Sequence, residues 1–142
     1  VEISAPLLWH KQRSVSSTVS RRGKPARTQA RVVAHAASGQ DSLSLVALRI
    51  ATGRRHQIRV HTSRLGHPTV RDGRYSASEV FMADGAWCQR NFLHRHSLAF
   101  CDSTGSLREA FEVLPHDLAG TLKRLSPRNT AMSSELARWL SG

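Results

Sequence analysis

The segment LSLVALRIATGRRHQIRVHTSRLGHP, residues 43–68, contains the clearest change of pattern in the chain, from a strand to a helix. Residues 43–51 are apolar at both odd and even positions, which predicts a central strand with two buried faces. Residues 55–65 then follow helical spacing. The side chains that share one face of this helix are Ile58, Thr62 and Leu65. Gly66 favours the end of the helix, because glycine readily adopts the left-handed conformation found there.

The segments on either side predict a mixed α+β architecture. The 142 residues correspond to a single domain, residues 1–142, in which residues 11–27 are rich in Ser and Arg and predict a flexible basic loop. Apolar residues near the N-terminus predict an edge strand or a loop. Further strands are expected at residues 28–35, 92–101 and 109–113, and C-terminal helices at residues 118–125 and 133–140. We therefore expect an α+β fold with a mixed, antiparallel-leaning sheet flanked by helices.

The charge balance indicates a nucleic-acid partner. Lys and Arg number 21 against 10 acidic residues, which gives a net charge of +11 and a pI near 11.5. A pI above about 9 is typical of domains that bind nucleic acids. The charge is spread along the chain rather than along one amphipathic helix, and no apolar run approaches the roughly 20 residues of a membrane span, so a membrane partner is not expected.

The two cysteines, Cys88 and Cys101, form neither a CxxC pair nor a disulfide framework. We expect an intracellular, reducing compartment, and the sequence leaves cytoplasm, nucleus and organelle open. His94 and His96 share a predicted strand, but no third ligand motif accompanies them, so no metal site is expected. Trp9, Trp87 and Trp139 are isolated in the sequence, and packing explains them better than stacking on nucleobases.

The segment TGRRHQIRVH, residues 52–61, places several cations at the start of the predicted helix. Cations at this end oppose the helix dipole, at a cost of a few tenths to about 1 kcal/mol each. Such a cluster needs a negative partner, either an RNA phosphate or a buried carboxylate; a solvated basic patch is the plain alternative. The residues expected to contact RNA are Arg54, Arg55, His56, Gln57 and Arg71.

The longer segment TGRRHQIRVHTSRLGHPTVRDGRYSA, residues 52–77, resembles the TGR-x-HQIR-VH…LGHP…GD..Y signature of RluA-family RNA pseudouridine synthases. The flanking segments KPARTQARVV, residues 24–33, and NFLHRHSLAF, residues 91–100, resemble the strands on either side of that signature. The resemblance implies the C-terminal half of a pseudouridine synthase fold. It also implies isomerisation of uridine to pseudouridine in rRNA or tRNA, without a cofactor.

In this family a nucleophilic Asp lies in an HRLD-type motif, followed by a Tyr in a K-x-Y segment. Neither motif occurs in the chain. The resemblance therefore implies a C-terminal portion of the catalytic domain, whose partner is the missing N-terminal part of the same protein. Arg59 matches the family's Arg that pairs with the catalytic Asp, and without that Asp we expect its charge to be unpaired.

Three arginines depart from the family pattern. Arg55 stands in place of Thr, Arg71 in place of Gly, and Arg95 in place of Ala, so each adds a positive charge. The first interpretation is an enzyme fragment, which should be inactive on its own. Two other functions are also compatible with the sequence. The chain could be a catalytically inactive RNA-binding, ribosome-associated or assembly factor derived from this family, or an unrelated basic ribosome component.

Overall fold

A long antiparallel hairpin organises the protein, for which the computed structural model describes residues 1–10 and 16–141. Strands β4 (Arg27–Ser38) and β5 (Asp41–Ile50) form this hairpin around a turn at Gly39, whose φ of +59° suits glycine. Strands β1 (Glu2–Ser4) and β8 (Ser126–Pro127) pair with the other edge of β4. The predicted α+β class with an antiparallel sheet is confirmed.

The prediction that residues 43–51 form a central strand is wrong for the described part of the chain. There β4 has neighbours on both sides, while β5 pairs only with β4. Apolar side chains on both faces indicate what packs above and below a strand, and they carry no information about how many strands lie beside it. The neighbouring strand prediction, residues 28–35, is confirmed within the longer β4.

The expected flexible loop at residues 11–27 is only partly tested, because residues 11–15 lie outside the described residues. Beyond them, β3 (Ser16–Val19) pairs with β2 (Leu7–His10), so the loop prediction is wrong there. Backbone hydrogen bonds then join Lys24 to Leu7 at 2.9 Å in both directions. A Cβ at Gly23 would lie 2.4 Å from the Leu7 backbone, so only glycine permits this approach. A composition of Ser and Arg does not reveal such backbone pairing.

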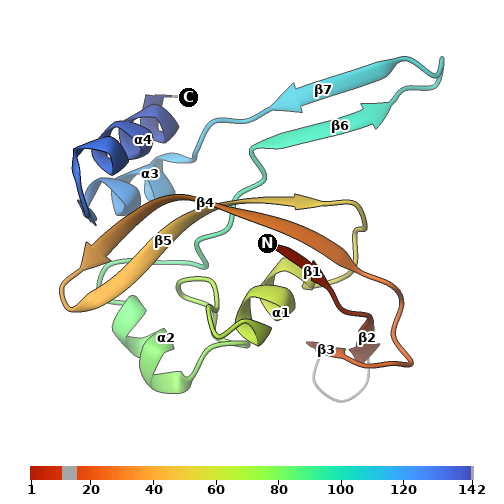
Figure 1. Cartoon of the computed structure of the whole chain (residues 1–142), viewed down its shortest axis with the longest axis horizontal. Helices are drawn as coiled ribbons and strands as arrows, with labels where there is room; N and C mark the ends of the chain where they lie inside the picture. The colour runs from red at the N-terminus through yellow and green to blue at the C-terminus, as the bar shows by residue number, and fades with distance from the viewer. Residues whose placement is uncertain (11–15, 142) are drawn as a thin grey trace.

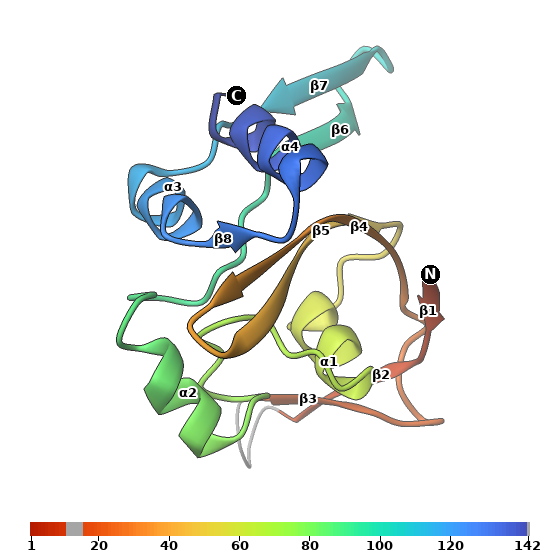
Figure 2. The same cartoon turned by 60° about the vertical axis from the view of Figure 1, so that its left-hand side comes forward.

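Helices cover the hairpin on both faces (Figure 2). Helix α1 (Gln57–Arg64) packs on one face with β2 and β3, around a small core of Leu7, Ala26 and Val60. The other face carries α3 (His116–Lys123) and α4 (Thr130–Ser141). Their core consists of Ala34, Ala36, Leu122 and Leu136. The predicted helices at residues 55–65, 118–125 and 133–140 are thus confirmed, with shifted ends.

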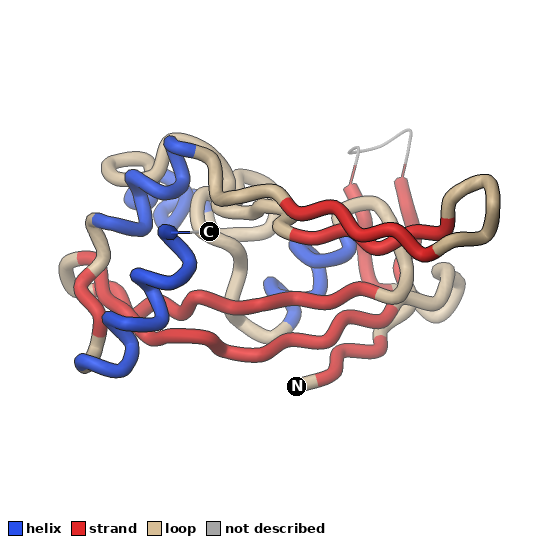
Figure 3. Tube along the Cα trace, turned by 90° about the horizontal axis from the view of Figure 1, so that it is seen from above, coloured by secondary structure: helices blue, strands red, loops and turns tan. Residues whose placement is uncertain are grey.

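Two elements differ from the sequence expectation. The short helix α2 (Ser78–Asp84) was not expected. Strands β6 (Ser97–Cys101) and β7 (Leu107–Phe111) form a separate hairpin that extends away from the body (Figure 3), and every residue in both strands is exposed. The strand expected at residues 92–101 begins only at Ser97, and the strand expected at residues 109–113 begins earlier, at Leu107. Within the described residues, no helix is long and apolar enough to cross a lipid bilayer.

Candidate functional site

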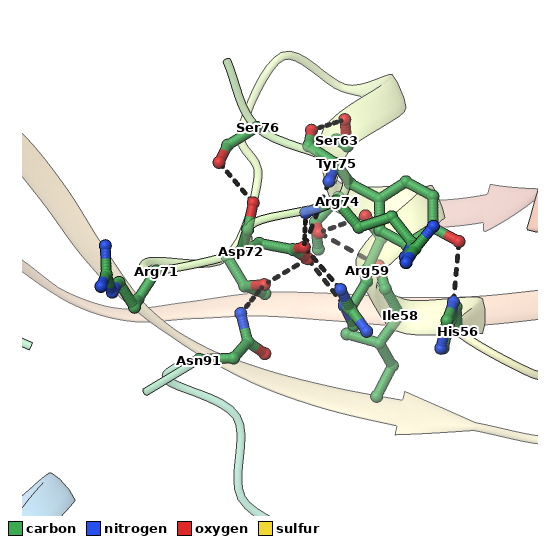
Figure 4. A network of polar contacts seen from close by, with 12 residues as sticks. His56, Ile58, Arg59, Ser63, Arg71, Asp72, Arg74, Tyr75, Ser76 and Asn91 are labelled. Atoms are coloured by element: carbon green, nitrogen blue, oxygen red, sulfur yellow. Dashed lines mark hydrogen bonds and ion pairs between the residues drawn. The ribbon is translucent and has the colours of Figure 1, made fainter. Parts of the chain in front are cut away.

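An ion pair between α1 and the loop before α2 forms the centre of the candidate site (Figure 4). Arg59 donates from Nε to Oδ2 of Asp72 at 2.7 Å and from Nη2 to Oδ1 at 2.6 Å. The side chain of Asp72 is 0% exposed, while that of Arg59 is 23% exposed. The expectation that Arg59 would have no carboxylate partner within the chain is therefore wrong.

Asp72 is held by more than Arg59. Its Oδ1 accepts hydrogen bonds from the backbone N–H groups of Arg74 at 3.0 Å and Tyr75 at 3.1 Å. Its Oδ2 accepts a further bond from the Thr69 hydroxyl at 3.2 Å. With five donors and no exposure, this carboxylate is shielded from a substrate and is suited to fix Arg59 in place. The sequence showed Asp72 only as part of a turn, although it lies within the same signature as Arg59.

The electrostatics keep both partners of this pair charged. Burial acts to raise the pKa of Asp72, but the hydrogen bonds from Arg59 and from the backbone amides outweigh it, so the pKa lies below its ordinary value. The hydrogen bond to Asp72 raises the pKa of Arg59. The bonds to Asp72 use Nε and Nη2 of Arg59. They leave Nη1 for a partner from outside the described residues.

A second group of side chains surrounds the beginning of α1. The backbone N–H of Ser17 donates to the Tyr75 hydroxyl at 2.8 Å, and that hydroxyl lies 2.8 Å from Nδ1 of His56. His56 itself has a left-handed φ of 54°, which is why α1 begins at Gln57 rather than at residue 55. Sequence reasoning missed Ser17 and Tyr75, because their contacts join segments that are distant in the chain.

The surroundings of His56 favour its neutral form by lowering its pKa. Burial is the largest cause that lowers its pKa from the ordinary 6.5, followed by the positive charges of Arg59, Arg55 and Arg74. A neutral imidazole can accept a hydrogen bond from the Tyr75 hydroxyl at Nδ1 or donate one to it, depending on its tautomer. In the tautomer with the proton on Nε2, Nδ1 accepts from the Tyr75 hydroxyl and Nε2 can act as a hydrogen-bond donor.

Among the remaining predicted site residues, Arg55 is exposed and Arg54 is partly exposed, whereas Gln57 is buried. Arg54 and Arg55 lie before α1; the Nε of Arg54 donates to the Pro25 carbonyl at 3.0 Å, and the guanidinium of Arg55 lies over the Trp9 ring with Cζ 4.0 Å from its centroid. Gln57 is only 2% exposed. Its amide group is occupied by hydrogen bonds to Arg27, Thr28, Thr52 and Arg54. The expectation that Gln57 contacts RNA is therefore not met, because its buried amide joins the start of α1 to neighbouring segments of the chain.

Arg71 is also engaged within the chain. Its guanidinium donates to the Phe81 carbonyl oxygen and lies over the Phe81 ring, with Cζ 3.8 Å from the ring centroid. Its backbone N–H donates to Asp84 at 2.6 Å. Figure 4 shows Arg71 directed away from Arg59 and Asp72. These contacts fix α2 against the loop and leave Arg71 less suited to contact RNA than Arg54 or Arg55.

The other candidate ligands have ordinary roles. The rings of His94 and His96 both lie 3.0 Å from the Glu112 carbonyl oxygen. Cys88 is buried, and burial raises the pKa of its thiol, whereas Cys101 is exposed. In the part of the chain that the structure describes, no three His, Cys, Asp or Glu side chains are arranged to hold a metal ion.

Comparison with known proteins identifies similar sequences and structures. Residues 2–64 match the family model described as RNA pseudouridylate synthase. Ribosomal large subunit pseudouridine synthase D of Haemophilus influenzae is 31% identical over 132 residues, which cover 87% of this chain and 40% of that protein. The dual-specificity RNA pseudouridine synthase RluA of Escherichia coli K12 is 42% identical over 76 residues, which cover 54% of this chain and 32% of that protein.

The fold is similar to solved structures as well. Human RNA Pseudouridylate Synthase Domain Containing 1 superposes with a TM-score of 0.73 at 28% identity, over 100% of this chain and 59% of that chain. Human RNA Pseudouridylate Synthase Domain Containing 4 superposes with a TM-score of 0.61 at 21% identity. The chain thus spans less than half the length of the two bacterial relatives.

Proposed function

The chain belongs to the RluA family of RNA pseudouridine synthases, and from this membership we propose that it carries the RNA-facing, arginine-bearing part of an enzyme that isomerises uridine in rRNA or tRNA. The observation that carries the proposal is the geometry of Arg59, which is fixed by Asp72 and retains one free edge. An intracellular location follows from these RNA substrates.

Arg59 has the role of an electrostatic partner. A carboxylate within about 4–6 Å of a guanidinium has its pKa lowered by about 1–3 units and so remains ionised. The nucleophilic Asp of the family would gain this stabilisation at Nη1. Because Asp72 already orients the guanidinium, Arg59 needs little rearrangement when that second carboxylate binds. The His-Arg-x-Asp string is absent from the 142 residues, so in this proposal the nucleophile comes from another segment of polypeptide.

The reaction itself is a balanced rearrangement. The bond between N1 of uracil and C1′ of the ribose breaks, and C5 of the rotated base bonds to C1′. The hydrogen of C5 leaves to water while N1 gains a proton, so nothing is oxidised or reduced. The uridine must leave its stack, at a cost of a few kcal/mol. In this proposal Arg54 and Arg55 hold the flanking phosphates during this step.

Tritium release from RNA labelled at C5 of uridine tests the proposal. We expect no release by the isolated 142 residues, because they lack the family's nucleophile. A polypeptide that joins this chain to a segment with the HR-x-D motif should release tritium. In that longer protein, Arg59→Lys should recover only part of the activity lost in Arg59→Ala, since Lys keeps the charge but loses the fork of donors. Clear turnover by the isolated chain would refute the assignment of the nucleophile.

A second function is favoured by one specific observation. Arginines replace the family's uncharged residues at positions 55, 71 and 95, and no catalytic Asp motif is present, as suits an inactive RNA-binding factor on the ribosome. The same tritium assay separates the two functions. A longer protein that binds RNA tightly but releases no tritium would support the binding factor over the enzyme.

A further inference from the structure

We propose that Arg55 and Trp9 form a stacking subsite for one unpaired nucleobase of the RNA. The inference rests on the proposed function in one respect, namely that RNA is the ligand. It goes beyond that function because it names a base-binding position in addition to phosphate contacts. Trp9 belongs to β2, and Arg55 lies in the turn before α1, so the pair joins two segments far apart in sequence.

The guanidinium of Arg55 lies over the Trp9 ring. The Cζ atom of Arg55 lies 4.0 Å from the centroid of the Trp9 ring, well within the roughly 6 Å limit of a cation–π contact. The ring of His56 meets the same indole edge-on, with centroids 5.8 Å apart. The backbone of Arg55 is also fixed, because its carbonyl accepts a 2.6 Å hydrogen bond from the Ser17 hydroxyl. The backbone and the guanidinium of Arg55 are therefore both held in place.

Arg55 differs from two nearby arginines because its guanidinium is still available to bind a ligand. Arg59 is paired with Asp72, and Arg71 donates to the Phe81 carbonyl. Arg55 is an exposed residue, and among residues 1–10 and 16–141 its guanidinium has no hydrogen-bond acceptor. Because Arg55 is exposed, the side of its guanidinium away from the indole is open to a ligand. A nucleobase can stack on that face, as bases do on Arg planes in RNA-binding proteins.

The location fits a base that flanks the target uridine. Trp9, His56 and Tyr75 follow one another through edge-on ring contacts of 5.8 and 5.6 Å, and Cζ of Arg59 lies 5.0 Å from the Tyr75 ring. A continuous row of rings thus joins the Arg55 stack to the proposed partner of the nucleophile. Because the family signature has Thr at position 55, the subsite is not expected in relatives that keep this Thr.

Binding of two oligomers by the 142-residue chain tests the subsite. One is decauridylate, and the other has the same number of phosphates but abasic spacers in place of every nucleotide. We expect the wild-type chain to prefer decauridylate about tenfold, since one stacked base contributes a factor of roughly 5 to 150. Arg55→Lys keeps the charge and loses the planar group, so this preference should fall to about twofold or less while affinity for the abasic oligomer is unchanged.

Two further variants make the test specific. Trp9→Leu should remove the same preference, and the double variant should lose no more than either single variant, because both residues act in one stack. Arg124→Lys is the matched control, since Arg124 is exposed at the end of α3 and distant from the row of rings. It should retain the full tenfold preference. Circular dichroism melting of each variant verifies that it is folded.

Each outcome is decisive. If Arg55→Lys retains the wild-type preference, or if the wild-type chain binds both oligomers equally, the stacking subsite is refuted while RNA binding stands. If the wild-type chain binds neither oligomer, the proposed RNA function itself fails for this part of the protein. A loss of preference in both single variants, with unchanged abasic binding, supports the subsite.

Discussion

The stability of the chain should depend on Arg59, because Asp72 is a buried carboxylate. Removal of one partner of a buried ion pair typically costs about 3–5 kcal/mol. We expect Arg59→Ala to lower the free energy of unfolding by about 3 kcal/mol, the lower end of that range, since the Thr69 hydroxyl and two amides still bind Asp72. Urea unfolding of the isolated chain measures this loss.

Arg90→Ala serves as the matched control for that prediction. Arg90 also forms a two-point ion pair, with Asp117, but the two side chains are 46% and 48% exposed. Exposed pairs contribute about 0–1 kcal/mol, so the control should lose little stability. Equal losses in the two variants would contradict the structural role given to Asp72. An activity loss in Arg59→Ala must accordingly be interpreted together with its folding.

The titration of His56 gives a second residue-scale prediction. We expect an NMR-detected pKa below 6.5, because burial and the nearby charges of Arg59, Arg55 and Arg74 disfavour the imidazolium. The unfolded chain then binds this proton more tightly, so His56 contributes to a loss of stability as the pH falls below about 6.5. Bound RNA phosphate should raise the pKa again. His56→Gln identifies the signal, and a midpoint at or above 6.5 would contradict the prediction.

The sequence predicted part of the site, because cations at the start of a helix oppose the helix dipole and are therefore conspicuous. The excess of cations at the start of the predicted helix indicated Arg54, Arg55 and Arg59. The pairing of Arg59 with Asp72 was missed, because contacts between residues thirteen positions apart depend on how the loop after α1 folds back. Gln57 was predicted to contact RNA as part of the segment at residues 52–61; its full set of internal hydrogen bonds becomes visible only in three dimensions.

At the scale of elements, periodicity succeeded where an element has a long packed face. Strand β4 and helices α1, α3 and α4 were predicted, because each repeats its apolar spacing over several positions. Helix α2 has only seven residues, too few to show a periodic stripe. The exposed β6–β7 hairpin has no buried face to fix its register in the sequence, and both strands were displaced in the prediction.

The loop that leads to α2 supports a prediction at this scale. Arg71 has a left-handed φ of 58°, at the position where the family signature has Gly. A non-glycine residue in this conformation costs about 1–2 kcal/mol, while the contacts of Arg71 with Phe81 offset part of the cost. We expect Arg71→Ala, which keeps the strain and loses the contacts, to be less stable than Arg71→Gly by about 1 kcal/mol. Thermal unfolding compares the two variants, and an Ala variant at least as stable as the Gly variant would exclude strain at this position.

For the whole molecule, net charge predicts how strongly RNA binding depends on salt, which the fold alone does not show. The chain carries +11, and 18 of its 21 cationic residues are Arg. Charges spread over a surface attract a polyanion from any direction, whereas planar groups such as that of Arg55 act only at contact. Affinity for RNA should therefore contain a large term that depends on salt and a smaller term that depends on stacking, and the two can be measured separately.

The salt dependence of RNA binding is the test at this scale. Each phosphate that the protein neutralises on a single strand adds about −0.7 to the slope of log K against log salt, because counterions are released. If Arg54 and Arg55 each bind one phosphate, the slope for decauridylate is about −1.4 or steeper. Arg54→Gln should make the slope shallower by about 0.7. Arg55→Lys keeps its charge, so it should weaken binding without changing the slope. A flat salt dependence for the wild-type chain would show that phosphate contacts do not carry the affinity.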